Sequence, residues 1–134
     1  MINMSSFNFN IPIFLALLVA TMAFQCSATE HVVGDNDGWS NPRYPEFYAE
    51  WASLHTFNVG DSLYFNFIED THDVAEVPQE AYDQCHTEGV KIIIKIGPGA
   101  VNLTSSGAHH YISTHEGDCE THQKVAIYVQ PSSV

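Results

Sequence analysis

Basic residues are scarce in this 134-residue chain: four Lys and Arg stand against sixteen Asp and Glu, giving a formal net charge of −12 at pH 7. A surface this acidic repels phosphate groups, so nucleic acid and anionic membranes are poor partners. The sequence also contains no internal repeat and no low-complexity tract. One domain with a solvated acidic surface is the interpretation that remains.

Charged residues are missing altogether from residues 1–28. This stretch holds an apolar run from Ile11 to Phe24, which is too short to cross a bilayer comfortably. The small side chains of Cys26 and Ala28 suit a signal peptidase, which needs small residues just before its cut. We therefore expect residues 1–28 to be a signal peptide and the mature, secreted chain to begin near Thr29. The alternative is a buried N-terminal helix.

Cysteine is scarce too, with three in the whole sequence. Cys26 leaves with the signal peptide, so Cys85 and Cys119 remain as a pair in an oxidising compartment, where we expect them to form a disulfide. The bridge would close a loop of about 35 residues and contribute roughly 4 kcal/mol in the chain-entropy model. A domain of about a hundred residues benefits from such a staple because it buries limited apolar area.

The carboxyl end carries no polar spacer and no hydrophobic tail, so we expect no lipid or membrane anchor. Residues 29–130 are predicted to form the single domain, and residues 131–134 a short tail. We expect the protein to be a monomer.

Short apolar segments rich in β-branched and aromatic residues predict an all-β sandwich or barrel. The predicted strands are 31–34, 63–67, 90–96, 110–113 and 125–129, with glycine-containing turns between them. Residues 46–52 and 79–84 each follow a proline and predict two short helices. Seven aromatic residues are expected to fill the space between the sheets: Trp39, Phe47, Tyr48, Trp51, Phe57, Phe65 and Phe67.

Asn102-Leu-Thr104 matches the acceptor motif for an N-linked glycan. In a secreted chain we expect Asn102 to be glycosylated, provided that it lies on the surface.

Several segments, spread over the whole mature chain, resemble one known family. They are His31-Val-Val-Gly-Asp35, Gly38-Trp39, Phe47-Tyr48, Trp51-Ala52, Val59-Gly-Asp-Ser-Leu63 with Phe65, His72-Asp-Val-Ala-Glu-Val77, Tyr82-Asp-Gln-Cys85, Gly107-Ala-His109 and Gln123-Lys-Val125. In this order they resemble the phytocyanins, which are plant cupredoxins. The resemblance implies a cupredoxin-like Greek-key β-sandwich with one or two short helices, and secretion to the apoplast.

The resemblance also implies where a blue-copper ion would be held. In the family one His comes from an early strand, and a late loop supplies Cys, then His five residues on, a structural Cys one further on, and an axial Met or Gln four beyond that. With Cys119 as the structural cysteine, these positions are Ser113, Asp118 and Gln123, and His72 matches the first ligand. Serine offers a hard oxygen where the copper needs a soft thiolate, so we expect no blue copper.

The family includes an early nodulin-like branch in which the copper ligands are replaced, and this sequence resembles that branch. The resemblance implies a role at the cell surface or wall. We therefore expect a secreted non-redox module that binds an extracellular or cell-wall partner, with no cofactor. A copper-binding electron-transfer protein is the alternative.

Two other metal arrangements stay open at this point. A remnant pocket using His72 and Asp118, with His115 or His122, could bind Zn(II) or Cu(II) without redox function. A shifted site could instead use Cys119 and His122 as a short Cys-x-x-His loop, which a closed disulfide would exclude.

An enzyme is not expected. Ser113 with His109, His110 or His115 and Asp118 suggests a catalytic triad, but no nucleophile elbow precedes this serine. The acidic residues Asp70, Asp73 and Glu76 near His72 are expected to be solvated rather than paired for acid–base catalysis.

Overall fold

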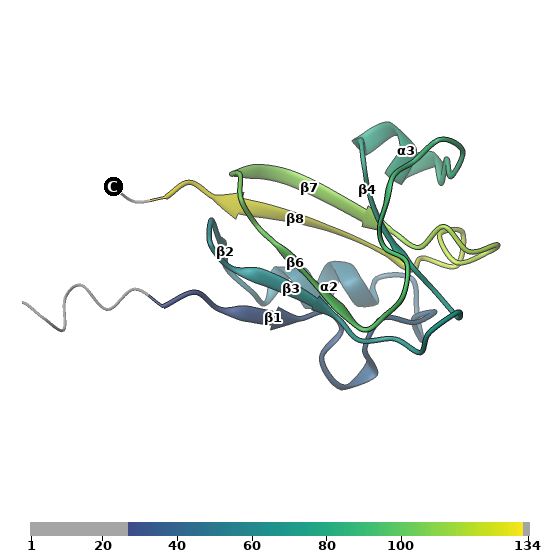
Figure 1. Cartoon of the computed structure of the whole chain (residues 1–134), viewed down its shortest axis with the longest axis horizontal. Coiled ribbons are helices and arrows are strands. Elements are labelled where there is room, and N and C mark those ends of the chain that lie inside the picture. Colours follow the sequence, from purple (N-terminus) through teal and green to yellow (C-terminus); the bar gives the residue numbers. More distant parts are fainter. Residues whose placement is uncertain (1–26, 133–134) are drawn as a thin grey trace, which may run out of the picture.

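The computed structural model describes residues 27–132, which form two β-sheets packed face to face (Figure 1). Nearly all of the predicted signal peptide, and the last two residues of the tail, lie outside these residues. Both ends of the described chain emerge at the same end of the sandwich (Figure 1). Within residues 27–132, no helix is long and apolar enough to cross a membrane.

The smaller sheet has three strands in the order β1-β3-β6. These strands are β1 (Glu30–Val32), β3 (Ser62–Phe65) and β6 (Gly99–Asn102). β1 pairs with β3 in parallel and β3 pairs with β6 in antiparallel, with Leu63 opposite His31 on one side and Val101 on the other. Because β1 and β3 are parallel, the chain must cross over between them, and α2 lies in that crossover.

The larger sheet has five strands in the order β2-β8-β7-β4-β5. They are β2 (Phe57–Asn58), β4 (Val74–Val77), β5 (Ile92–Ile94), β7 (Gly107–Ile112) and β8 (Lys124–Gln130). The long antiparallel β7–β8 hairpin is its centre, and its connecting loop lies at the end opposite the chain termini (Figure 1). The strands on either side of β7 therefore start or end close to this loop.

Both predicted short helices are confirmed, as α2 (Phe47–Ser53) and α3 (Gln79–Gln84). Pro78 is the N-cap residue of α3 and has an extended backbone. A proline fits at this position because a helix does not use the backbone N–H groups at its start. A 3₁₀ turn, η1 (Asp35–Asp37), follows β1. Gly34, which precedes η1, has φ of 76°, and a side chain there would meet the carbonyl oxygen of Gly38 at 2.4 Å. This turn therefore requires glycine.

Aromatic side chains fill the space between the sheets as predicted. Six of the seven expected residues are buried in the main core, and Phe47 packs against it partly buried. Trp39 has ring contacts with Tyr48 and Phe65 at centroid distances of 5.1 and 5.0 Å. Tyr111 belongs to the same core although its position in the sequence did not single it out.

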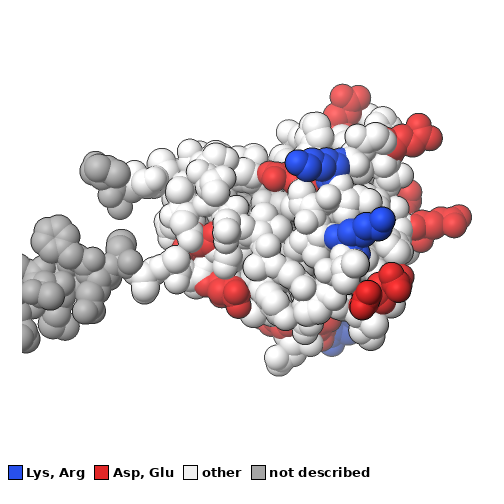
Figure 2. Space-filling model, viewed as in Figure 1, with Lys and Arg blue, Asp and Glu red and all other residues white. Residues whose placement is uncertain are grey.

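The five strands predicted from the sequence are present, and three more are found. The strand predicted over 90–96 is shorter, at Ile92–Ile94. β2 has two residues, and β6 lies among glycine and proline residues, so neither gives a period-two pattern long enough to predict a strand. On the face shown in Figure 2, most acidic side chains lie toward the end opposite the termini, and the Lys and Arg side chains lie among them.

The predicted disulfide between Cys85 and Cys119 is present. It joins the end of α3 to the β7–β8 loop, and Cys119 is buried with Ala75, Val77 and Ile112 in a second, smaller core. The two cysteines are 34 residues apart in the sequence. The bridge therefore fixes the long β7–β8 loop against the edge of the larger sheet.

Removing this bridge should destabilise the domain. The double variant Cys85→Ala/Cys119→Ala frees a loop of about 35 residues in the unfolded chain, so its free energy of unfolding should fall by about 2–4 kcal/mol. Urea denaturation followed by tryptophan fluorescence measures this difference. An unchanged unfolding midpoint would show that the bridge does not contribute to stability.

Candidate functional site

Four residues singled out in the sequence meet at one end of the larger sheet: His72, Ser113, Asp118 and Gln123, here called the four-residue site. Ser113 follows β7 and Gln123 precedes β8, and the Ser113 amide donates to the Gln123 carbonyl at 3.2 Å. His72 stands two residues before β4, the neighbour of β7 in the sheet. The sheet order therefore brings together residues that are up to 51 positions apart (His72 to Gln123).

The Asp118 carboxylate is the centre of this site. Its Oδ2 accepts a hydrogen bond from the Ser113 hydroxyl at 2.6 Å and lies 2.7 Å from His72 Nδ1. Its Oδ1 accepts from the Asn41 side-chain amide at 3.0 Å. Because an ionised carboxylate can only accept, His72 carries a proton on Nδ1 and donates it to Asp118.

Burial is the largest influence on the Asp118 carboxyl and raises its pKa, but the hydrogen bonds from Ser113, His72 and Asn41 together outweigh it. The pKa of Asp118 therefore lies below its ordinary value, and the group is ionised at neutral pH. Ser113 is fully buried and Asp118 is 6% exposed, so few water molecules compete for these bonds.

Gln123 is fully buried beside the carboxylate. Its Oε1 accepts from Asn41 Nδ2 at 2.8 Å, while its Nε2 has no hydrogen-bond partner among the described residues. Asn41 thus links Gln123 to Asp118, a role that the sequence analysis missed. It lies 77 positions before Asp118 in an irregular segment, and no motif or spacing connects the two.

A second layer of hydrogen bonds surrounds the site. The Asp73 carboxylate accepts from both the backbone N–H and the hydroxyl of Thr114, and the Trp39 indole donates to the Asp73 carbonyl at 2.8 Å. Glu76 pairs with His109. The expectation of a solvated carboxylate was therefore wrong for Asp73, which is buried and accepts both bonds from Thr114 in the loop after β7. Glu76 is exposed to solvent, as expected. Asp70 lies in an exposed turn.

Of the histidines in the alternative metal site, His115 lies near His72. The His115 ring lies 6.5 Å from that of His72, and its Nε2 is 4.0 Å from Asp73. For His122, within residues 27–132, the structure gives no side-chain hydrogen bond or ion pair. No three histidine, cysteine or acidic side chains of the described chain are placed to share a metal ion.

The geometry of this loop matches neither a catalytic triad nor the shifted copper site. Ser113 Oγ donates to Asp118 and lies 3.4 Å from the Asp73 amide, and among the described residues no histidine bonds to it. A catalytic triad needs a histidine base bonded to the nucleophile and a third residue that orients the histidine, and the described residues around Ser113 do not form this arrangement. Cys119 is held in the disulfide, so its sulfur cannot be the thiolate of a shifted copper site.

Comparison with known proteins identifies the fold and the family. A family described as "Plastocyanin-like domain" matches residues 39–123. The chain is 38% identical over 104 residues to cucumber peeling cupredoxin from Cucumis sativus, covering 76% of each protein. It is 36% identical to a blue copper protein of Arabidopsis thaliana and 32% identical to early nodulin-16 of Medicago truncatula, covering 87% and 89% of this chain. It spans 58% and 68% of those two relatives.

Two solved structures of cucumber proteins have the same fold as this chain. Cucumber stellacyanin with Cu²⁺ superposes with a TM-score of 0.76 at 36% identity, covering 81% of this chain and all of that one. Cucumber basic protein, a blue copper protein, gives 0.66 at 27% identity, covering 75% and 99%. The expected cupredoxin-like sandwich of two sheets with short helices is therefore confirmed.

The residues present do not fit a blue-copper ion. Such an ion needs a thiolate and two imidazoles in a trigonal arrangement. The resemblance assigns the thiolate position to Ser113, whose hydroxyl donates to Asp118, and the second imidazole position to Asp118 itself. The nitrogen of His72 that faces the site is already bonded to that carboxylate. The donors point at Asp118 and not at a shared central position.

The fold and the sequence indicate the same family. The match spans residues 39–123, relatives above 30% identity cover more than two thirds of the chain, and the copper-containing cucumber structure shares its sheets. The chain therefore belongs to the plastocyanin-like, or phytocyanin, domain family.

Proposed function

We propose that this protein is a secreted, non-redox binding module of the phytocyanin family, in which a buried carboxylate replaces the blue-copper ion. The observation that carries the proposal is the Asp118 carboxylate, which takes hydrogen bonds from His72, Ser113 and Asn41 at 2.6–3.0 Å. A carboxylate satisfied in this way is a structural centre. It links the start of β4, the β7–β8 loop and the segment before α2.

Electron transfer needs the sulfur that this site lacks. A thiolate gives copper a soft, strongly covalent ligand and a path for the electron. The Ser113 hydroxyl does not ionise near neutral pH and is fully buried, with Asp118 as its acceptor. Rapid one-electron exchange is therefore not part of the proposed function, and neither is catalysis.

The extracellular setting is supported by three features of the chain. Residues 1–28 have the composition of a signal peptide, and the Cys85–Cys119 disulfide is typical of an oxidising compartment. Asn102, the proposed glycan acceptor, is exposed at the end of β6. Relatives named early nodulins share 32% identity, and we propose a similar setting in the apoplast with an extracellular or wall partner.

A second candidate is a non-redox Zn(II) or Cu(II) site. The observation that favours it is the position of His115, whose ring lies 6.5 Å from that of His72 beside Asp73 and Asp118. Binding there would require His72 to exchange its hydrogen bond to Asp118 for a metal bond.

Copper titration tests the first proposal against both alternatives. Purified wild-type protein with one equivalent of Cu(II) should show no intense visible thiolate-to-copper absorption. Calorimetry should find no saturable site at micromolar metal. The blue absorption would overturn the proposal, and a colourless saturable site lost in His115→Ala would favour the second candidate.

Restoring the ligands should restore the metal site. The double variant Ser113→Cys/Asp118→His supplies a thiolate and an imidazole beside His72 and Gln123, so Cu(II) should produce the intense blue absorption. Asp118→His alone is the matched control and should stay colourless because it has no thiolate. A folded, colourless double variant would contradict the assignment of these positions.

The Asp118 carboxylate should contribute stability that depends on pH. Its pKa is lowered in the folded protein, so its contribution is complete above the unfolded pKa of about 3.9 and is lost as pH falls through the lower folded value. Asp118→Asn should lower the free energy of unfolding by about 1–3 kcal/mol at pH 6, and the deficit should shrink toward pH 2.

The measurement is urea denaturation at a series of pH values. Asp83→Asn, at an exposed position of α3, is the matched control and should change stability by less than about 0.5 kcal/mol. A deficit for Asp118→Asn that is constant from pH 6 to pH 2 would contradict the role given to the carboxylate.

Glycosylation of Asn102 is tested by expression through a eukaryotic secretory pathway. Intact mass should exceed that of the mature polypeptide by one N-glycan, and both Asn102→Gln and Thr104→Ala should remove the excess. A wild-type mass equal to that of the bare mature polypeptide would refute it.

A further inference from the structure

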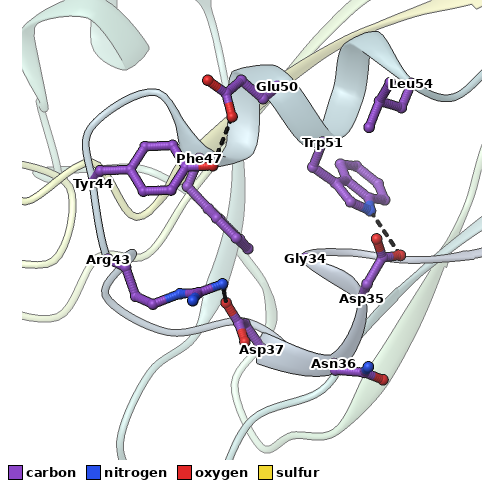
Figure 3. Close-up of a pocket in the computed structure, with 10 residues that line it drawn as sticks. All are labelled: Gly34, Asp35, Asn36, Asp37, Arg43, Tyr44, Phe47, Glu50, Trp51 and Leu54. Atoms are coloured by element: carbon purple, nitrogen blue, oxygen red, sulfur yellow. Dashed lines mark hydrogen bonds and ion pairs between the residues drawn. The ribbon is translucent and has the colours of Figure 1, made fainter.

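A cleft opens between η1 and α2 (Figure 3), and none of its lining residues belongs to the four-residue site. We call it the η1–α2 cleft. Its volume is about 310 Å³, and its principal lining residues are Asp35, Asp37, Arg43, Phe47, Glu50 and Trp51. The space is large enough for one long side chain of a partner.

One side of the cleft is apolar. Phe47 and Trp51 come from the inner side of α2, and Leu54, just after the helix, is 82% exposed at the rim. In Figure 3 the side chains of Phe47 and Trp51 flank the opening from the helix above it. Trp51 is only 4% exposed, so the accessible apolar surface is that of Phe47 and Leu54. An alkyl chain can pack against these two side chains, and removing their apolar surface from water is favourable.

The charged side chains that line the cleft are mostly acidic. Three carboxylates line the cleft, and each is held by one bond: Asp35 by the Trp51 indole at 3.2 Å, Glu50 by the Tyr44 hydroxyl at 2.6 Å, and Asp37 by Arg43 at 2.8 Å. Within residues 27–132 the second oxygen of each carboxylate has no hydrogen-bond partner. These oxygens are available to accept bonds from a ligand.

Arg43 shows which kind of group the cleft accommodates. Its guanidinium pairs with Asp37 and lies 5.9 Å from the centre of the Phe47 ring, a cation–π distance. Among the described residues, no Lys or Arg forms an ion pair with Asp35 or Glu50. The cleft thus holds three negative charges and one positive charge in a protein whose net charge is −12.

We propose that the η1–α2 cleft binds a cationic side chain, Arg or Lys, of a basic extracellular polypeptide. The alkyl stem packs along Phe47 and Leu54, and the charged head lies among the carboxylates that line the cleft, those of Asp35, Asp37 and Glu50. A neutral saccharide could use the aromatic wall but would gain nothing from the excess of negative charge. This inference rests on the proposed binding function and assigns it a site and a class of partner.

The two tryptophan indoles provide the measurement. The Trp51 N–H donates to Asp35 in the cleft, whereas the buried Trp39 N–H donates to Asp73 behind the four-residue site. Titrating ¹⁵N-labelled protein with N-acetyl-arginine amide should shift the Trp51 indole signal saturably and leave that of Trp39 in place. N-acetyl-citrulline amide, which has nearly the same shape without the charge, should produce no saturable shift.

Matched variants locate the site. Asp35→Asn/Glu50→Gln removes two charges while keeping an oxygen for the Trp51 and Tyr44 bonds, and Asn tolerates the positive φ of residue 35. Affinity should fall about tenfold, as it should in 0.5 M salt. Glu80→Gln/Glu88→Gln, at exposed positions outside the cleft, should leave affinity within about twofold.

A peptide with Arg at its centre should bind at least as tightly as N-acetyl-arginine amide, and spermidine should bind more weakly than the peptide. The proposal is overturned by an absent or unsaturable Trp51 shift, by an equal response to citrulline or to cellobiose, by tighter binding of spermidine, or by unchanged affinity in Asp35→Asn/Glu50→Gln. Any of these results leaves the copper titration unaffected, so failure of this site is distinguishable from failure of the proposed function.

Discussion

The buried carboxylate of Asp118 is the group around which this end of the molecule is organised. A charge removed from water is costly unless donors surround it, and here an imidazole, a hydroxyl and an amide do so. Those donors come from three separate parts of the chain. The carboxylate therefore joins these three segments at one end of the larger sheet. Among the buried side-chain nitrogen and oxygen atoms of the described chain, the Gln123 amide nitrogen alone has no hydrogen-bond partner.

The rest of the sandwich does not depend on this centre. Two sheets enclose an aromatic core around Trp39, Tyr48 and Phe65, and the Cys85–Cys119 bridge fixes the long loop independently of its polar contents. This separation explains how a family fold can keep its shape while its ligand residues change, because hydrophobic burial and loop closure supply the stability. It also leaves other surfaces, such as the η1–α2 cleft, free to carry binding.

Much of this arrangement could be predicted from the sequence, and the exceptions have physical causes. Short segments rich in β-branched and aromatic residues, with turns between them, indicated the long strands. The prolines before residues 46–52 and 79–84 indicated both helices, and cysteine pairing followed from the compartment. The short strand β2 and the glycine-flanked β6 exist because neighbouring strands pair with them, which no local pattern reveals. The meeting of His72, Ser113, Asp118 and Gln123 followed the family spacing. The contribution of Asn41 could not be predicted, because only the tertiary fold brings it there.

The tautomer of His72 tests the account most directly. If the Asp118 carboxylate has taken the place of a metal, the imidazole must present a proton to it from Nδ1. Nitrogen-15 NMR of the histidine side chains at neutral pH should therefore find Nδ1 of His72 protonated and hydrogen-bonded. A neutral ring with its proton on Nε2 and a bare Nδ1, ready to bind a metal ion, would contradict the account.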